Sequence, residues 1–267
     1  MNIALVLRNT DTGGDPDFIA MRNRLEQNGV NTEIITEPIA KGSFDFVLSV
    51  GGDGTMLSAV SLVRDSGVPI VGVNFGHLGF LTTMDAEATV TLADDLREGR
   101  YAVEHRTLLQ FSALDAKLPE SCALNEVSLH RQIDAPMLRT RVFVDDRYVA
   151  TYSADGLIVA TPTGSTAYSM SCGGPILTPD SGCFAITPIC AHSLTLRPII
   201  VPDTAAITLI TEPSGGSSFC LSADSRHTML PTGTTVSLRR AGFTVGIVRM
   251  RGQDFFSAIH EKLSWDA

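Results

Sequence analysis

Three groups of residues in this sequence have types and spacing that could carry chemistry. The first is a short run that follows the apolar stretch at residues 44–50 and precedes a helical pattern. It consists of Gly51, Gly52, Asp53, Gly54 and Thr55. Glycines let the backbone approach a phosphate chain, and the unpaired N–H groups at a helix N-terminus attract anionic oxygens. A carboxylate would repel phosphate, so Asp53 indicates a metal ion or a proton acceptor for an attacking hydroxyl.

The alternative for this run is a plain tight turn, which an Asp-Gly pair favours by itself. Two further glycines, a flanking threonine and a position between a strand and a helix favour a phosphate site, because ligands bind at such strand ends in open α/β folds. Neither a GxxxxGK(S/T) loop nor a GxGxxG fingerprint occurs in the sequence. The common nucleotide-binding motifs are therefore excluded.

The second group is a long segment, residues 155–175, in which a short apolar strand leads into closely spaced hydroxyls and glycines. Hydroxyl groups beside accessible backbone suit the recognition of sugars and phosphates. Tyr168 offers a ring on which a base can stack. A glycine-rich loop that covers a core is the structural alternative. The length of the segment, its tyrosine and the carboxylate of Asp155 at its start favour a binding segment.

The third group is the pair Asn125-Glu126, which lies just before an alternating strand pattern. Neighbouring side chains in extended backbone point to opposite faces, so only one of the two would usually face a ligand. A strand end or a bulge could let both side chains reach it. A solvated turn is the simpler interpretation of the pair taken alone.

The first hundred residues alternate between strand and helix patterns. Asp15 as an N-cap, Pro16 at the first helical position and Gly29 at the C-terminal end mark the first helix. Strands are expected over residues 2–7, 30–36, 44–50 and 68–73, and further helices after Thr55 and from Asp85 to Gly99. This alternation predicts an α/β sheet with mainly parallel strands.

After about residue 100 most apolar runs have the length and alternation of strands. They cover residues 108–114, 126–130, 138–144, 148–153, 157–160, 206–211 and 235–238. Between two of these runs, Asp145-Asp146 is expected to form a hairpin turn. The second half of the chain is therefore predicted to be rich in β-structure.

The tail, residues 254–265, is expected to be a helix with one apolar face. That face comprises Phe255, Phe256, Ile259 and Leu263. A short amphipathic helix must bury such a face, and the first domain is the natural place. We therefore expect an α/β domain over residues 1–99, completed by about residues 245–267, and a β-rich domain over residues 100–244.

The composition of this 267-residue chain restricts its partners. The net charge is −9 and no basic block occurs, so no nucleic-acid surface is expected. No apolar stretch reaches the roughly 18 residues of a membrane span, and the N-terminus lacks the basic start of a signal peptide. The five cysteines show no CxxC spacing and are expected to be reduced, buried thiols of a cytoplasmic protein.

Taken together, these motifs resemble those of the NAD kinase family. The resemblance rests on the 51–55 run, the Asn125-Glu126 pair and the 155–175 segment. Further matches lie at residues 72–81, 192–194, 197–198, 224–226 and 262–265, so the resemblance covers nearly the whole chain. Diacylglycerol, sphingosine and 6-phosphofructo kinases carry similar glycine-aspartate runs, whereas the long hydroxyl-rich segment is specific.

The resemblance implies an N-terminal Rossmann-like α/β domain, a β-sandwich-like C-terminal domain and a homotetramer or homodimer. It implies transfer of the ATP γ-phosphate to the 2′-hydroxyl of the adenosine ribose of NAD, with Mg²⁺ or another divalent cation. Asp53 would be the general base, and backbone N–H groups at Gly54 and its neighbours would bind phosphate. The implied NAD-binding residues are Asp53, Gly54, Phe75, Asn125, Glu126, Ser153, Asp155, Thr166, Ala167, Tyr168 and Ser171, with Arg226 as a weaker candidate.

Two positions depart from the family pattern. Ser153 stands where members that prefer NAD strictly often carry arginine, which leaves the use of NADH open. Cys172 replaces a common alanine and is expected to be a small buried residue, since no basic neighbour in the sequence would lower its pKa.

Two other functions are compatible with parts of the pattern. A lipid or sugar kinase of the same superfamily would share the glycine-aspartate run, but a lipid kinase would need an amphipathic basic segment, which the sequence lacks. A non-catalytic regulator could keep the dinucleotide pocket. It would gain nothing from the carboxylate of Asp53, so the kinase is favoured.

Overall fold

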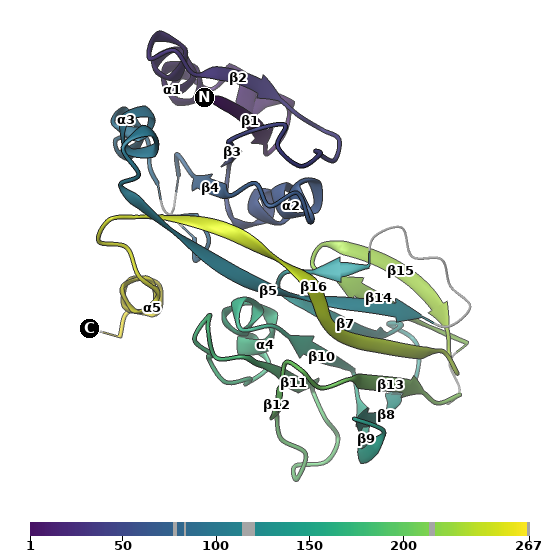
Figure 1. Cartoon of the computed structure of the whole chain (residues 1–267). Helices are drawn as coiled ribbons and strands as arrows, with labels where there is room; N and C mark the ends of the chain where they lie inside the picture. The colour runs from purple at the N-terminus through teal and green to yellow at the C-terminus, as the bar shows by residue number, and fades with distance from the viewer. Residues whose placement is uncertain (77–78, 83, 114–120, 214–216, 266–267) are drawn as a thin grey trace. The chain divides into compact units, whose positions relative to one another are not determined.

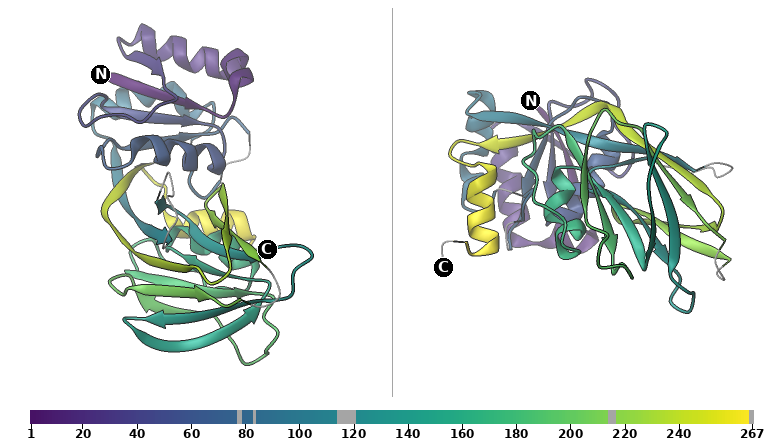
Figure 2. Two further views of the ribbon diagram at one scale, coloured as in Figure 1. Left: turned by 90° about the vertical axis from the view of Figure 1, so that its right-hand side faces the viewer. Right: turned by 90° about the horizontal axis from the view of Figure 1, so that it is seen from below.

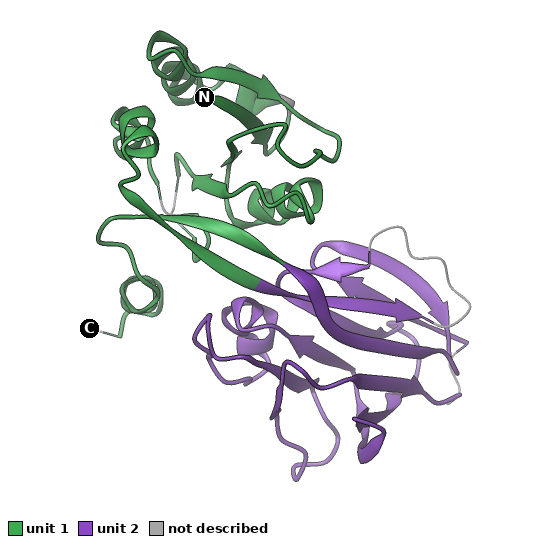
Figure 3. Cartoon of the chain, viewed as in Figure 1, with its two compact units in different colours: residues 1–106, 244–267 green, residues 107–243 purple. Residues whose placement is uncertain are grey.

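The computed structural model describes the chain except residues 77–78, 83, 114–120, 214–216 and 266–267. The chain forms two compact units (Figure 3). Unit 1 comprises residues 1–106 and 244–267, and unit 2 comprises residues 107–243. The boundaries expected from the sequence were 99 and about 245. The chain thus leaves unit 1 and returns to it.

Unit 1 is built on a parallel sheet with helices, as the alternating sequence pattern predicted (Figure 1). The strand order is β2-β1-β3-β4, followed by the C-terminal part of β16. The strands are β1 (Asn2–Leu7), β2 (Asn31–Ile34), β3 (Phe46–Val50), β4 (Ile70–Val73) and β16 (Thr235–Met250). The helices are the 3-10 helices η1 (Thr10–Gly14) and η2 (Ala88–Val90), and α1 (Pro16–Gln27), α2 (Asp53–Val63), α3 (Leu92–Arg97) and α5 (Phe255–Leu263). All five residues of β3 are buried, as its apolar run indicated.

The ends of α1 follow from local chemistry. The Asp15 side chain accepts the backbone N–H groups of Asp17 and Phe18, and Pro16 occupies the first helical position. Gly29 follows the helix with a φ of +69°, which glycine adopts without strain. The predicted start and stop of this helix are confirmed.

The prediction of one continuous helix from Asp85 to Gly99 is wrong. The structure divides it into η2 and α3, with Thr91 between them. Thr89, Val90 and Thr91 are consecutive β-branched residues, which lose side-chain freedom inside a helix. The Thr91 hydroxyl donates to Asp95 Oδ2 and so stabilises the start of the second piece.

The apolar face expected for the tail helix is only partly correct. The Asp254 side chain caps α5 by accepting the N–H of Ser257, and Ile259 is buried. Phe256, however, is 61% exposed. Residues 255, 259 and 263 form a stripe at a spacing of four, and Phe256 lies beside that stripe rather than on it.

Unit 2 is a sandwich of two mainly antiparallel sheets (Figure 2). In the first, β16, β13, β8 and β9 pair in that order, β5 pairs with β16, and β6 pairs with β5. In the second, the order is β12-β11-β10-β7-β14-β15. The strands are β5 (Tyr101–Ala113), β6 (Cys122–Ala123), β7 (Glu126–Arg131), β8 (Leu138–Val144), β9 (Arg147–Ala154), β10 (Gly156–Ala160), β11 (Cys183–Ile189), β12 (Ile199–Pro202), β13 (Ile207–Thr211), β14 (Ser218–Ala223) and β15 (Arg226–Pro231).

One hydrophobic core holds the two sheets of unit 2 together. Leu209 and Leu238 of the first sheet belong to the same buried cluster as Val127 and Phe184 of the second. Burial of this cluster removes apolar surface from water, which is the main stabilising term for such a sandwich. The α/β class with a β-rich second half is therefore confirmed.

Two strands are longer than the sequence pattern predicted. The run expected at 108–114 corresponds to the C-terminal half of β5, which ends at Ala113, whereas the run expected at 235–238 is only the start of β16, whose continuously buried part is residues 245–249. Each of the two strands has residues in both units. Asp145 and Asp146 form the predicted hairpin turn, with φ values of +48° and +61°. In the described part of the chain, every helix is too short or too polar to cross a membrane.

Candidate active site

The glycine-aspartate run joins β3 to α2 in unit 1. Gly51 has a φ of +147°, and a Cβ at this position would lie 2.3 Å from Thr55 Oγ1. Only glycine fits such a position without strain. Asp53 is the first residue of α2, so the run supplies the N-terminal N–H groups of a helix at the carboxyl end of a parallel strand.

The Asp53 carboxylate is held by a second segment of unit 1. Oδ2 accepts the N–H of Phe80 at 2.9 Å, and Oδ1 accepts the N–H of Leu81 at 3.1 Å. Oδ1 also accepts the N–H of Thr82 at 3.2 Å and its hydroxyl at 3.3 Å. A Cβ at Gly79 would lie 2.0 Å from Oδ1. Residues 79–82 thus form a cradle for the carboxylate. Residues 79–81 had carried part of the resemblance, but no sequence feature placed them beside Asp53.

A hollow of about 620 Å³ lies beside this helix N-terminus, within the usual range for small-molecule sites. Its lining residues are Leu7, Arg8, Gly52, Gly54, Thr55, Ser58, Asn74 and Gly76. Three residues predicted to bind phosphate therefore share one concave surface. Phe75, predicted to bind NAD, lies between two lining residues and packs partly against the unit 1 core. His77 and Leu78, which carried part of the resemblance, lie outside the described residues.

Arg8 is a functional candidate that the sequence analysis missed. It follows β1, and Leu7 pairs with Val50 in the parallel neighbour β3, so Arg8 reaches the same sheet edge as the glycine run. Its side chain is exposed, and the described part of the chain offers its guanidinium no ion pair or hydrogen bond. The sequence does contain a signal for Arg8, because it is a basic residue directly after β1, the strand that pairs with β3.

In unit 2 the Asn125-Glu126 pair is fixed through its backbone. Asp224 accepts the N–H groups of Leu124 at 3.0 Å, Asn125 at 2.8 Å and Glu126 at 3.3 Å. The Asn125 carbonyl accepts the N–H of Thr161 at 2.9 Å. In the sequence, Asp224 was noted only as part of the resemblance to the family. No sequence feature placed it beside the Asn125-Glu126 pair, which is about a hundred positions away.

Arg226, predicted as a weaker NAD-binding candidate, lies in the same cluster. Its guanidinium donates to the carbonyl oxygens of Cys122 and Ala223 and lies 3.7 Å from Asp224 Oδ2. These contacts tie the chain just before the Asn125-Glu126 pair to the turn that follows β14. In this arrangement Arg226 supports the backbone of the pair.

Glu126 is buried beside a second carboxylate. Its Oε2 has no hydrogen-bond partner within the described residues. Burial, and then the charge of Asp224, raise the pKa of Glu126 to about 8. The Glu126 side chain is therefore expected to be a neutral hydrogen-bond donor at pH 7.

The raised pKa of Glu126 predicts a pH-dependent stability. Between its ordinary value of 4.5 and about 8, the folded chain keeps a proton that the unfolded chain has released. The free energy of unfolding should therefore fall as the pH rises through this window. Urea unfolding measures this free energy at pH 5 and at pH 8. The decrease between the two pH values should be smaller for Glu126→Gln than for wild type. Glu33→Gln, at an exposed position, should keep the wild-type fall, and equal falls in all three proteins would contradict the assignment.

Some residues of the hydroxyl-rich segment are buried and hold the fold together, whereas others are exposed on the surface. After β10 it forms the 3-10 helix η3 (Thr163–Thr166) and the short helix α4 (Tyr168–Ser171). Ser165 and Ser169 are fully buried and bond to Leu177 and Thr187, as a loop covering a core would. Among the predicted binding residues Thr166 is buried, Ala167 half-buried, and Tyr168 and Ser171 exposed.

Near the C-terminal end of this segment lies a second group of residues that were predicted to bind NAD. Tyr168 stacks on His130 with ring centroids 5.8 Å apart, so one face of its ring is occupied by protein, although the residue as a whole is 39% exposed. Asp155 pairs with Arg131 at 2.5 Å. Ser153 lies on β9, with its hydroxyl 3.9 Å from Met137 Sδ. Cys172 is half-buried, and burial raises the pKa of its thiol, as expected for an unreactive cysteine.

Strand register places these candidates along one line. Glu126 pairs with Ala160, and His130 pairs with Gly156, so the two groups occupy opposite ends of the β7–β10 pair. Four residue steps separate them, which is about 13 Å of extended strand. The 163–171 segment connects the ends, since Gly164 abuts Asn125 and Tyr168 contacts His130. Unit 2 therefore presents an elongated row of candidate residues.

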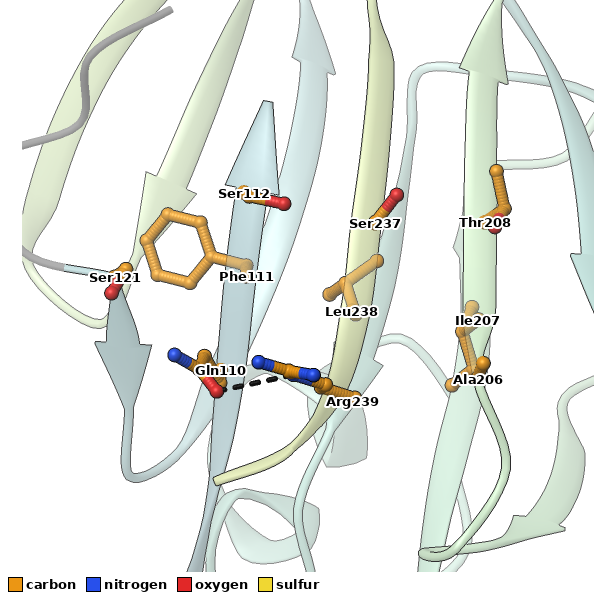
Figure 4. A pocket seen from close by; sticks show the side chains of 10 residues that line it. All are labelled: Gln110, Phe111, Ser112, Ser121, Ala206, Ile207, Thr208, Ser237, Leu238 and Arg239. Atoms are coloured by element: carbon orange, nitrogen blue, oxygen red, sulfur yellow. Dashed lines mark hydrogen bonds between the residues drawn. The ribbon is translucent and has the colours of Figure 1, made fainter. Parts of the chain in front are cut away.

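A separate groove of about 460 Å³ lies on the first sheet of unit 2 (Figure 4). Its walls include polar side chains of β5, β13 and β16, and Gln110 accepts a hydrogen bond from Arg239 across neighbouring strands. None of the residues predicted to bind NAD or phosphate lines it. The groove thus gives no alternative location for the predicted site.

Comparison with known proteins identifies the family. The ATP-NAD kinase N-terminal domain matches residues 9–101, and the ATP-NAD kinase C-terminal domain matches residues 124–250. The NAD kinase of Flavobacterium psychrophilum is 40% identical over 84% of this chain and 76% of its own length. That of Christiangramia forsetii is 35% identical over 97% of this chain and 89% of its own length.

Solved structures show the same fold. An NAD kinase from Archaeoglobus fulgidus, in complex with ATP, superposes with a TM-score of 0.81 at 27% identity, covering 99% of both chains. Yeast NADH kinase, complexed with NADH, superposes with a TM-score of 0.88 at 24% identity, covering 100% of this chain and 88% of its own. The sequence motifs, the two domain matches and these relatives agree, and the chain belongs to the NAD kinase family.

Proposed function

We propose that this chain transfers the γ-phosphate of ATP to the 2′-hydroxyl of the adenosine ribose of NAD, with Asp53 as the general base. The observation that carries the base assignment is the unequal use of the two Asp53 oxygens. Oδ1 accepts three hydrogen bonds and Oδ2 accepts one. Each carboxylate oxygen has about two lone-pair sites, so Oδ2, with a single donor, keeps one site for a substrate hydroxyl.

Phosphoryl transfer depends mainly on positioning and on charge stabilisation. Asp53 would accept the ribose proton as the oxygen attacks phosphorus. The N–H groups of Gly52 and Gly54 at the start of α2, and the guanidinium of Arg8, would stabilise the phosphate oxygens along the hollow. Arg8 supplies a cation in a protein whose net charge is −9.

The phosphate donor is ATP, and we propose that it enters as a complex with Mg²⁺ or another divalent cation. Mg²⁺ usually keeps several waters and binds through one or two carboxylates and the nucleotide phosphates. Within the described residues there is no group of three or more His, Cys, Asp or Glu side chains that could hold a metal ion. A cation carried by the ATP phosphates fits this donor set. It would neutralise phosphate charge.

The row of candidates in unit 2 suits the length of a dinucleotide. Asn125 and Glu126 would hydrogen-bond NAD at one end of the row, and Asp155 would lie near the nicotinamide at the other. Tyr168 and Ser171 offer exposed groups between them. Ser153 places a small side chain near Asp155, so NADH is proposed as a second acceptor.

The test is NADP formation from NAD, ATP and Mg²⁺, measured with an NADP-specific dehydrogenase. NADH replaces NAD in a parallel reaction, followed by NADPH formation. Saturable turnover that needs both nucleotides supports the proposal. Binding of NAD without turnover would instead indicate a regulator that keeps only the pocket.

Replacing Arg8 by alanine is expected to raise the KM for ATP about tenfold and to leave the KM for NAD within about twofold. One charge-assisted hydrogen bond to phosphate is worth about 1.5–3 kcal/mol, and solvent screening places an exposed arginine at the low end. Arg147→Ala is the control, because Arg147 is also exposed but lines no part of the hollow. An unchanged KM for ATP in Arg8→Ala would remove Arg8 from the phosphate site.

We further propose a cytoplasmic homodimer or homotetramer. All five cysteines are free thiols, which suits a reducing compartment. The expectation that they are buried is wrong, because four are half-buried and Cys190 is exposed. Ile133, Leu194, Phe256 and Trp265 are large apolar side chains that are more than half exposed, so their surface is available to subunit contacts. Light scattering on the purified chain measures the assembly, and a monomer at micromolar concentration would contradict it.

A further inference from the structure

The hydroxyl of Thr82 lies between the backbone of Gly79 and the carboxylate of Asp53. Thr82 is buried, with 1% of its surface exposed. Its Oγ1 accepts the N–H of Gly79 at 2.8 Å and lies 3.3 Å from Asp53 Oδ1. A hydroxyl has one proton to donate. Since Asp53 Oδ1 is an acceptor, the hydroxyl of Thr82 donates its proton to the carboxylate.

This hydroxyl adds a side-chain donor to the carboxylate oxygen that two backbone N–H groups already hold. Without it, Oδ1 would accept two backbone N–H groups, from Leu81 and Thr82, and Oδ2 would accept one, so the numbers of donors would differ by one. The Thr82 hydroxyl is a third donor to Oδ1, which has two lone-pair sites, so it shares this oxygen with the two N–H groups and adds to the hold on it, while Oδ2 has one donor. Rotation of the carboxylate by half a turn would exchange the oxygens, and the buried hydroxyl opposes any intermediate orientation that breaks these bonds.

The segment that carries Thr82 is anchored independently of any ligand. A Cβ at Gly72 of β4 would lie 2.9 Å from the Leu81 carbonyl oxygen and 2.9 Å from Thr82 Cα, so the segment packs directly on the strand. The Phe80 carbonyl accepts a hydrogen bond from Arg249 Nη2 at 3.2 Å. Arg249 is 5% exposed and pairs with Glu104 at 3.0 Å. The cradle is therefore part of the unit 1 scaffold.

We propose that Thr82 is a positioning residue for phosphoryl transfer: its hydroxyl holds Asp53 so that Oδ2 stays available to the acceptor hydroxyl of the substrate. The proposal rests on the proposed role of Asp53 as general base. Thr82 itself touches no reacting atom. It acts through the orientation of the Asp53 side chain, as supporting groups do in preorganised sites.

The test compares two substitutions that separate the hydroxyl from the shape of the side chain. Thr82→Val keeps the shape and removes the hydroxyl, whereas Thr82→Ser keeps the hydroxyl. We expect Thr82→Val to lower kcat about ten- to a hundredfold, the range of one hydrogen bond to a charged group. The KM values for NAD and ATP should stay within about twofold, and Thr82→Ser should keep kcat within about threefold of wild type.

A matched control removes a buried threonine hydroxyl elsewhere in unit 1. Thr89 is 3% exposed and donates its hydroxyl to the Ala86 carbonyl at 2.6 Å. Thr89→Val should therefore alter thermal stability without a selective loss of kcat. All rates are expressed per folded molecule, after circular dichroism and a thermal melt. If Thr82→Val does not fold, Thr82→Ala replaces it in the same comparison with Thr82→Ser.

The double variant Asp53→Asn with Thr82→Val separates this proposal from the function on which it rests. We expect Thr82→Val to cause no further loss of kcat once Asp53 is asparagine, because the two residues act as a unit. Wild-type kcat in Thr82→Val beside an inactive Asp53→Asn overturns the role of Thr82 alone. Full turnover in Asp53→Asn overturns the base assignment and the role of Thr82 with it.

Discussion

Asp53→Asn is expected to fold and to lose about a hundred- to ten-thousandfold in kcat, the usual cost of removing a general base. The carboxamide has the shape of the carboxylate and can keep the donors on Oδ1. Its NH₂ group cannot accept a proton, and it would oppose the N–H of Phe80 that now binds Oδ2. The measurement is the kcat of NADP formation with both substrates saturating.

Asp17→Asn is the matched control for this experiment. Asp17 lies in the first turn of α1, as Asp53 lies in the first turn of α2, so both substitutions remove one favourable charge from a helix N-terminus. Asp17→Asn should keep wild-type kcat. Wild-type kcat in Asp53→Asn would instead limit Asp53 to a structural role, holding residues 80–82 against α2.

Gly164→Ala is expected to reduce the free energy of unfolding by about 2–4 kcal/mol, at or above the usual cost of overpacking. A Cβ at Gly164 would lie 2.1 Å from the Asn125 carbonyl oxygen and 2.4 Å from its carbonyl carbon. Both atoms are backbone, so no side-chain rotation relieves the clash. Asp224 holds Asn125 through its N–H, so the chain at Asn125 cannot retreat without breaking a hydrogen bond.

The same substitution should raise the KM for NAD at least about tenfold, because it displaces the Asn125-Glu126 pair. Urea unfolding and initial rates at varied NAD measure the two effects. Gly242→Ala is the control, since a Cβ at Gly242 of β16 would meet no atom within 4 Å. It should change the free energy of unfolding by less than about 0.5 kcal/mol. Wild-type stability and KM in Gly164→Ala would contradict the close approach to Asn125.

Features that depend on neighbouring residues could be predicted from the sequence. The start of α1 at Pro16, the buried strand β3 and the Asp145-Asp146 turn each follow from a few adjacent residues, through capping, apolar patterning and turn chemistry. The second half was harder to predict. Strands β11, β12, β14 and β15 were missed, because three of them contain proline or end in it and their stability comes from partners in the sheet rather than from local propensity.

For the candidate site, too, some features follow from neighbouring residues and others only from the tertiary structure. The sequence determined the family, the residue types that could bind phosphate and a dinucleotide, and the placement of Asp53 between a strand and a helix. Only the tertiary structure decided which groups hold those residues. The donors to Asp53 lie 27 to 29 positions away, and those to Asp224 lie 98 to 100 positions away. Such contacts arise when strands pair and pack, so no local pattern reports them, whereas motifs and caps act within a few residues.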